Sequence, residues 1–118
     1  MVAISFSEER FVKLIQQGKK DQTIRPYNPK RFEQIKRMKK LQLYYKQRTK
    51  ECRKIADAEL TEIFRIKFSQ LNPVEEIWLA LRDGFDGIVD FYNWFEKRYG
   101  KKLYDMEFMV IKFRITEG

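Results

Sequence analysis

The sequence predicts an α+β fold, a small and mostly antiparallel β-barrel or curved sheet with appended helices. The order of its elements is strand, helix, three strands, two helices and a last strand. Because helices and strands do not alternate regularly, we do not expect a doubly wound parallel sheet. The 118 residues fit one domain, and apolar residues are 43% of the chain, which is enough for a core.

The first elements are predicted from the spacing of apolar residues and from residues that begin or end helices. Residues Val2 to Phe6 read as a short strand. Ser7 can cap a helix whose apolar residues recur at helical spacing and which ends at Gly18. The stretch 22–25 is short and extended, and it precedes a loop that contains two prolines.

The middle of the chain predicts one helical turn and two strands. The basic residues 30–40 carry isolated apolar residues three positions apart, which allows a turn of helix. Apolar and polar residues alternate over 41–45, the pattern of a strand. The same alternation over 60–68 predicts a strand with one buried face.

Two helices and a strand complete the chain. Asn72 can cap a helix that runs to about Arg82. Asp86 can cap a second helix that ends at Gly100. The stretch 106–115 is apolar on both faces, so we expect a central strand that is covered on both sides.

Missing residue types exclude several kinds of chemistry. The chain has no histidine and one cysteine, Cys52. Catalytic triads that need histidine, intramolecular disulfides and the common structural zinc sites are therefore excluded, and we expect neither a metal nor a cofactor. No apolar run approaches the ~20 residues of a membrane span, and no secretory leader is visible. We therefore expect a cytoplasmic protein with no membrane partner.

Positive charge is concentrated in one part of the sequence. The net charge is +8, and residues 30–54 alone contribute +9. Clustered lysine and arginine in a chain with a pI near 9.6 predict a polyanion as partner, above all a nucleic acid. Two alternatives remain open, a solvated surface whose charge aids solubility and a protein-interaction module whose charge is incidental.

The segment 18–25, Gly-Lys-Lys-Asp-Gln-Thr-Ile-Arg, combines a helix stop, two lysines and an extended piece. Residues two apart in a strand point to the same side, so Thr23 and Arg25 share a face, with Lys20 just before them. Such a set can bind phosphate or a base. A basic connection in which Arg25 makes a structural ion pair is the alternative.

Four segments in order resemble the ASCH domain family (activating-signal-cointegrator homology), and the resemblance covers nearly the whole chain. The segment 18–25 is similar to the family's hallmark Gly-x-Lys-x-x-Thr-x-Arg. The other three are the strand 41–45 with Arg48-Thr49 and Cys52-Arg53-Lys54 after it, the segment 82–86, and the closing strand 107–113. The family's Gly-Asp turn is replaced by Lys39-Lys40. The resemblance implies one PUA-like barrel over residues 1–118.

The same resemblance implies that the protein binds RNA or a nucleotide in a basic cleft beside the barrel. Together with the charge pattern it gives these candidate binding residues: Lys19, Lys20, Thr23, Arg25, Lys36, Arg37, Lys39, Lys40, Tyr44, Tyr45, Arg48 and Arg53. Some small members of the family deacetylate acetylated cytidine. For that alternative function the catalytic residues carried over are Lys20, Thr23 and Asp83, and Asp83 stands where those members have a glutamate.

Aromatic residues give two further expectations. Tyr44 and Tyr45 lie beside basic residues, an arrangement that suits stacking on unpaired bases. Only one of the two can face the cleft, and the sequence does not say which. Four aromatic residues of the late helices are at helical spacing and are predicted to be core: Trp78, Phe91, Trp94 and Phe95.

Overall fold

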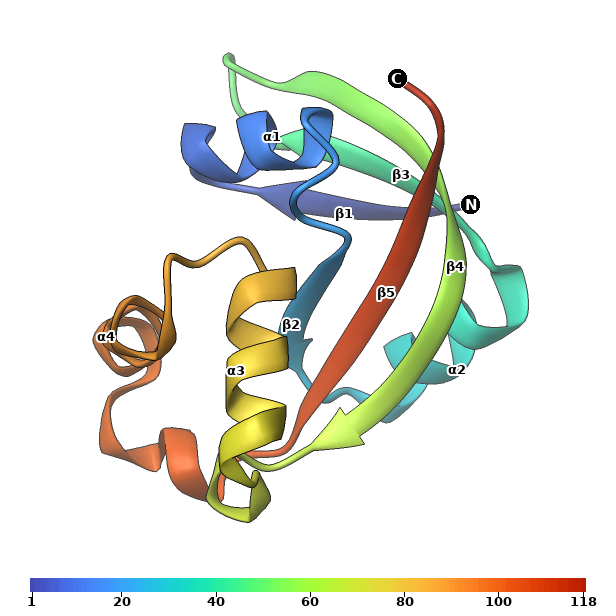
Figure 1. The fold of residues 1–118 in the computed structure, drawn as a ribbon. Coiled ribbons are helices and arrows are strands. Elements are labelled where there is room, and N and C mark those ends of the chain that lie inside the picture. Colours follow the sequence, from blue (N-terminus) through green and yellow to red (C-terminus); the bar gives the residue numbers. More distant parts are fainter.

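The computed structural model describes all 118 residues as a curved five-stranded sheet with four α-helices around it (Figure 1). The sheet order is β1-β3-β4-β5-β2. Strand β1 is parallel to β3 and every other pair is antiparallel. The strands are β1 Val2–Phe6, β2 Gln22–Pro26, β3 Lys40–Tyr45, β4 Arg53–Ile66 and β5 Phe108–Glu117. The predicted α+β class with a mostly antiparallel, barrel-like sheet is confirmed.

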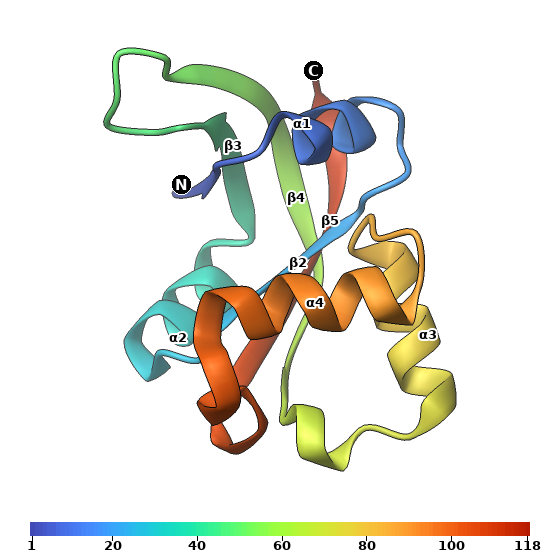
Figure 2. The same ribbon diagram turned by 90° about the vertical axis from the view of Figure 1, so that its left-hand side faces the viewer.

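The helices lie on different sides of this half-barrel (Figures 1 and 2). They are α1 Glu9–Gln16, α2 Pro29–Met38, α3 Pro73–Arg82 and α4 Ile88–Tyr99, with short 3₁₀ helices at Phe68–Gln70 and Gly100–Asp105. Helices α3 and α4 lie beside β2, whereas α2 lies toward the end of the sheet where β1 and β3 begin. None of the helices combines the length and the apolar character needed to cross a membrane.

The core contains a cluster of phenylalanine rings that joins α4 to the sheet. Phe68 lies 5.1 Å from both Phe95 and Phe108, measured between ring centroids. Phe91 and Phe95 are fully buried as predicted. The prediction for Trp78 is wrong, because its side chain is 57% exposed. Helix α3 turns its neighbours Leu79 and Ala80 toward the core instead, so the indole of Trp78 faces outward.

The sequence located most elements but misplaced some ends. Strand β4 begins at Arg53, well before the predicted start at residue 60. Its first half contains alanines and charged residues with low β-propensity, and it forms a strand because it pairs with β3. The N-cap positions are Glu8 for α1 and Gly87 for α4, one residue after the predicted Ser7 and Asp86, and no side chain caps either helix. The last strand, β5, is central as predicted, because it lies between β4 and β2 and is buried from Phe108 to Ile111.

The half-barrel is open between its two edge strands, β1 and β2. Ladder hydrogen bonds do not join these strands, but two arginine side chains donate to backbone carbonyls of β1. Arg25 of β2 donates from Nη2 to the carbonyl oxygen of Ser5 over 2.7 Å, and Arg31 of α2 donates to the carbonyl oxygen of Ala3. These carbonyls lie two residues apart and point to the same edge. Two cationic side chains therefore bind carbonyl groups on the open edge of β1, which could otherwise pair with another strand.

Candidate functional site

Lys20 is turned into the protein by the way α1 ends. Gly18 adopts a left-handed conformation with φ of 74°. The backbone N–H groups of Lys19 and Lys20 then both donate to the carbonyl oxygen of Leu14, over 2.8 and 3.2 Å. This tight turn leaves Lys19 exposed and Lys20 only 3% exposed. A lysine this deeply buried needs a partner.

The partner is Asp83, which follows the last residue of α3. Its backbone N–H donates to the carbonyl oxygen of Leu79 over 3.0 Å, which fixes it at the helix end. Gly84 then has φ of 93°, and a Cβ atom there would lie 2.9 Å from Leu14 Cδ1 and 3.4 Å from Lys20 Cβ. Only glycine therefore allows the α3–α4 loop to approach Lys20 this closely.

Lys20 and Asp83 make two contacts. Lys20 Nζ donates to the backbone carbonyl oxygen of Asp83 over 2.7 Å and lies 3.4 Å from Oδ2 of its carboxylate. The other carboxylate oxygen, Oδ1, accepts from Gln22 Nε2 over 3.4 Å. Gln22 Nε2 also donates to the carbonyl oxygen of Leu79 over 3.2 Å. Gln22, 1% exposed, thus orients the carboxylate from the side opposite Lys20.

Burial and charge shift the pKa values of both partners. Burial lowers the pKa of Lys20 below its ordinary value of 10.5, and nearby Arg25 lowers it further, while Asp83 opposes the shift. Burial raises the pKa of Asp83, and the charge of Lys20 opposes this. Such a lysine gives up its proton more readily than an exposed one, so its amine can serve as a base.

Thr23 and Arg25 form the second part of the cluster, on β2. Arg25 Nε donates to Thr23 Oγ1 over 2.9 Å. Burial lowers the pKa of Arg25 to about 10, so its guanidinium is still charged at neutral pH. Because Thr23 Oγ1 accepts from a cation, its hydroxyl proton stays free to be donated. Thr23 and Arg25 thus share a face of β2, as predicted, and their side chains contact each other there.

The cluster lines the floor of a small cleft between β1, β2 and α4. The inner cleft has a volume of about 40 Å³, which is space for one or two water molecules. Next to it lies an outer hollow of about 360 Å³ that shares Trp94 and Arg98 with the inner cleft. The lining residues of the two hollows are Phe6, Ser7, Glu8, Phe11, Lys20, Thr23, Ile24, Arg25, Asp83, Trp94, Phe95, Lys97, Arg98 and Tyr99.

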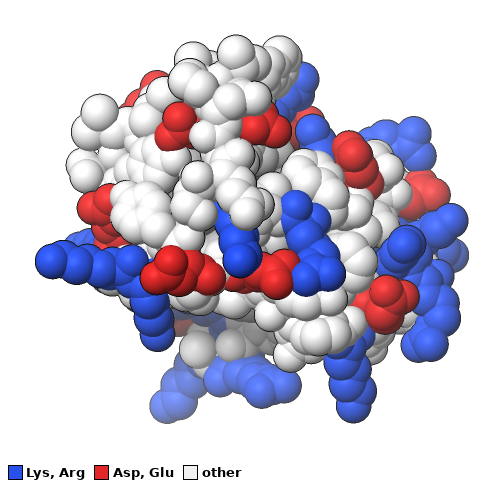
Figure 3. All heavy atoms as spheres, turned by 90° about the horizontal axis from the view of Figure 1, so that it is seen from below, with Lys and Arg blue, Asp and Glu red and all other residues white.

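The basic stretch 30–54 is divided by the fold. Lys36, Arg37, Lys39 and Lys40 are exposed at the end of α2 and the start of β3. The cleft residue Phe6 pairs with Tyr45 at the other end of β3, so these four lie away from the cleft. Figure 3 shows lysines and arginines dense on the α2 side. Their role in binding phosphate stays a prediction.

The two tyrosines and the hairpin arginines lie outside the cleft lining. Tyr45 is 8% exposed and packs in the core, whereas Tyr44 is half-buried. Arg53 covers the Tyr45 ring at 4.4 Å and forms an ion pair with Glu9. Arg48 is exposed in the β3–β4 turn with φ of 69°. Neither tyrosine offers its ring to the cleft floor.

The sequence missed three residues of this region. Gln22 lies inside the hallmark segment. Its position between the predicted site residues Lys20 and Thr23 was the signal in the sequence that could have identified it. Trp94 is half-buried and lines both hollows, so it is not a core residue alone as predicted. Arg98 is exposed one turn later and stacks on Trp94 at 5.3 Å. A cationic residue four positions after a tryptophan was the only sign of this rim.

A comparison of the sequence with profiles of known families and with characterised proteins gives no match. Solved structures do match. The hypothetical protein PH0355 is 18% identical, with a TM-score of 0.66 over 98% of this chain and 99% of its own. An ASCH domain from Lactobacillus crispatus JV V101 is 16% identical, with a TM-score of 0.59 over 99% of this chain and 80% of its own.

Protein PF0455 from Pyrococcus furiosus, solved by NMR in solution, is 18% identical, with a TM-score of 0.56 over 99% of this chain and 98% of its own. The three likenesses extend over nearly the whole chain and include the half-barrel and its helices. Since one of these structures is an ASCH domain, the expected resemblance is confirmed at the level of architecture: this chain has the ASCH-domain fold.

Proposed function

We propose that the protein binds a nucleoside or nucleotide, free or as an unpaired residue of RNA, in the cleft of Lys20, Thr23, Arg25 and Asp83. The observation that carries this proposal is the convergence of four polar groups from three segments beneath a cationic rim. Surface charge alone does not require lysine and aspartate to be buried together. A recognition site can use such a pair, because it has to present donors and acceptors in a fixed arrangement.

Each part of a nucleotide has a matching group. The inner cleft admits the edge of a base, and there the Asp83 carboxylate can accept from the exocyclic amine of cytosine or guanine. The half-buried Trp94 offers its indole ring for base stacking when Arg98, which lies over the ring at 5.3 Å, turns to the phosphate. Lys97 and Arg98 are exposed at the outer hollow and have no ion-pair partner, so they are free to bind phosphate.

Calorimetric titration with cytidine and guanosine monophosphates tests this proposal, with adenosine and uridine monophosphates as controls. Adenine also carries an exocyclic amine, but it lacks the ring carbonyl oxygen that cytosine and guanine both have. Uracil has no exocyclic amine. We expect the strongest binding for cytosine or guanine, and loss of that preference in Asp83→Ala. Equal, weak binding of all four would contradict base recognition in the cleft.

A second function, hydrolysis of an acetylated cytosine, is favoured by the shifted pKa of Lys20 and by the size of the inner cleft. Its volume of about 40 Å³ suits a small acyl group better than a whole base. The base would then lie in the outer hollow against Trp94, with its acylated nitrogen directed toward Thr23. The lowered pKa makes the neutral amine of Lys20 available as a base.

The reaction then runs in two steps. The Thr23 hydroxyl adds to the acyl carbon as Lys20 takes its proton, and the carbon–nitrogen bond breaks as Lys20 returns the proton to the cytosine amine. Water, deprotonated by Lys20, then hydrolyses the threonine ester and releases acetate. The Arg25 contact stabilises negative charge on Thr23 Oγ1, and Asp83 holds the Lys20 side chain in place.

Release of acetate from acetylated cytidine tests this second function. We expect Thr23→Ala and Lys20→Met each to abolish turnover, since nucleophile and base act as a unit. The rate should rise with pH and level off below the ordinary lysine value of 10.5, because Lys20 has a lowered pKa. Asp83→Glu restores the longer carboxylate and should raise the rate. Binding without turnover in both the wild type and Asp83→Glu would leave only the binding function.

A further inference from the structure

Helix α3 carries a stripe of large apolar side chains that are exposed to solvent. Val74, Ile77, Trp78 and Leu81 are 63%, 47%, 57% and 52% exposed. Their spacing of three and four residues places them on one face of the helix. Single exposed apolar residues are common, but a contiguous stripe that includes a tryptophan marks an interaction surface.

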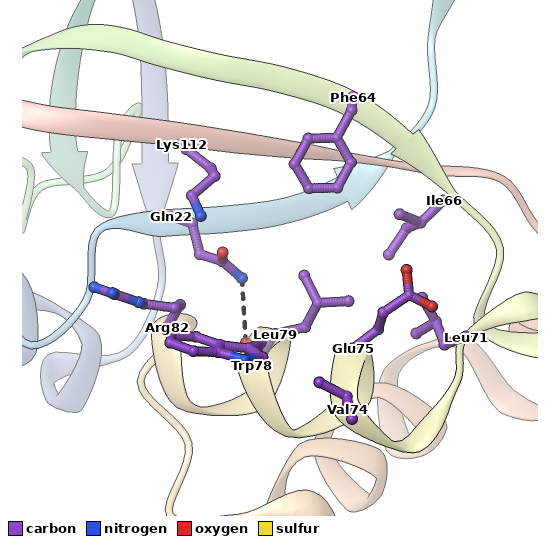
Figure 4. Close-up of a pocket in the computed structure, with 10 residues that line it drawn as sticks. All are labelled: Gln22, Phe64, Ile66, Leu71, Val74, Glu75, Trp78, Leu79, Arg82 and Lys112. Atoms are coloured by element: carbon purple, nitrogen blue, oxygen red, sulfur yellow. Dashed lines mark hydrogen bonds between the residues drawn. The ribbon is translucent and has the colours of Figure 1, made fainter.

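A groove runs beside this stripe, between α3 and the sheet (Figure 4). Its volume is about 220 Å³, and its walls include Phe64 and Ile66 of β4 together with Val74 and Trp78 of α3. This is larger than the inner cleft of the candidate site and more apolar. It offers space for a large apolar side chain from a partner. Stripe and groove form one continuous apolar surface.

Opposite charges mark the two ends of this surface. In Figure 4, Glu75 lies at one end of the groove, and Arg82 lies at the other with Lys112. Glu75 and Arg82 are seven residues apart, or about two helical turns, so they occupy the same flank of α3. Lys112 has no ion-pair partner, and Arg82 pairs with Asp21 in a contact that stays about half exposed. The flank is therefore acidic toward the start of α3 and basic toward its end.

We propose that a second copy of this chain covers the surface, with the two α3 helices packed antiparallel about a two-fold axis. An antiparallel arrangement places Glu75 of one copy opposite Arg82 of the other, and the reverse pair forms by symmetry. The charge pattern is thus complementary to itself. The apolar residues of each stripe lie along the seam, and Trp78 or Ile77 of one copy fills the groove of the other. A parallel arrangement would bring like charges together.

Sedimentation equilibrium over a wide range of protein concentration tests the dimer. The wild type should show a reversible monomer–dimer equilibrium. Ile77→Glu and Trp78→Glu should each raise the dimer dissociation constant at least about tenfold, as removal of a central apolar anchor does. Met38→Glu is the matched control, because Met38 is a comparably exposed apolar residue, 41%, on the distant helix α2. A wild type that stays monomeric up to about 1 mM would overturn the proposal, as would equal weakening by Met38→Glu.

A charge exchange tests the antiparallel arrangement itself. Glu75→Arg and Arg82→Glu should each weaken self-association, because each variant places like charges opposite one another. A mixture of the two variants should form a heterodimer more tightly than either variant alone, since every opposed pair is then of opposite sign. Glu75 also closes the capping box of α3, so thermal melting checks that both variants are folded. Failure of the mixture to associate more tightly would contradict the antiparallel two-fold pairing.

Discussion

The ammonium nitrogen of Lys20 lies 2.7 Å from the backbone carbonyl oxygen of Asp83, although the two residues are 63 positions apart. The contact is buried and joins the end of α1 to the end of α3. A buried ion pair is weak support for stability, because the desolvation of both charges offsets their attraction. We therefore interpret the pair as a functional arrangement that the surrounding core holds in place.

Loss of one partner should destabilise the protein in a pH-dependent way. In Lys20→Met, buried Asp83 loses its ion-pair partner, so the free energy of unfolding should fall by about 3–5 kcal/mol at neutral pH. The folded-state pKa of Asp83 is already raised and rises further. The stability deficit should therefore be small below the unfolded value of about 3.9 and should grow as pH rises above it. Urea unfolding at several pH values measures this.

The double variant Lys20→Met/Asp83→Asn is the control for that experiment. It removes both charges and leaves no unpaired ion, so it should recover most of the stability lost by Lys20→Met. A deficit in Lys20→Met that is independent of pH would mean that the methionine packs badly, and that Asp83 is not the cause.

Gly84 should tolerate no side chain. In Gly84→Ala, the new Cβ would approach Leu14 Cδ1 to 2.9 Å at a φ of 93°, so we expect a loss of about 1–3 kcal/mol in unfolding free energy. The loop must also shift, which lengthens the Lys20–Asp83 contact and weakens ligand binding. Gly87→Ala is the matched control, because nothing lies within 4 Å of a Cβ there. Equal effects of the two substitutions on thermal stability and binding would contradict the close-approach argument.

Arg25 and Arg31 should have separable roles. Both donate to carbonyls on the open edge of β1, but only Arg25 also contacts Thr23 and lines the cleft. Replacement of either by alanine should lower the unfolding free energy by about 1.5–3 kcal/mol, the range for hydrogen bonds to charged groups. Only Arg25→Ala should also weaken nucleotide binding. A similar loss of affinity in the folded fraction of Arg31→Ala would assign both arginines a structural role alone.

Two groups of basic residues should contribute to different ligands. Replacement of Lys97 and Arg98 by glutamine should weaken binding of a mononucleotide, because these residues lie at the rim of the cleft. Replacement of Lys36, Arg37, Lys39 and Lys40 should leave mononucleotide binding unchanged. It should reduce the salt dependence of binding to longer single-stranded RNA, as the loss of phosphate contacts requires. RNA affinity that does not change with salt would contradict the electrostatic part of this argument.

The sequence predicted the parts of the structure that depend on local pattern. The short strand β1, the capping of α3 and the apolar run in β5 were all predicted correctly, because each depends on its own residues. The segment from Gly18 to Arg25 also directed attention to the candidate site. The contribution of Asp83 came from resemblance, since spacing alone cannot bring residue 83 to residue 20.

The parts of the structure that the sequence did not predict depend on tertiary packing. The first half of β4 forms because β3 pairs with it, although residues 53–59 are poor strand formers. The basic stretch reads as one feature in the sequence, but a helix and a hairpin divide it in space. Trp78 and Trp94 have the spacing of core residues, yet one faces outward and the other lines the cleft. Hydrophobic periodicity identifies a helix face without indicating what covers it.

The most direct test of the central claim is a fluorescence titration with cytidine monophosphate in the Trp78→Phe background, in which Trp94 is the only tryptophan. A base that stacks in the cleft should change Trp94 emission in a saturable way. The added substitutions Lys20→Met/Asp83→Asn, which we expect to leave the protein folded, should weaken that response by at least about tenfold. A saturable response that is unchanged by the two substitutions, or no response at millimolar nucleotide, would contradict the claim that Lys20 and Asp83 recognise a nucleotide.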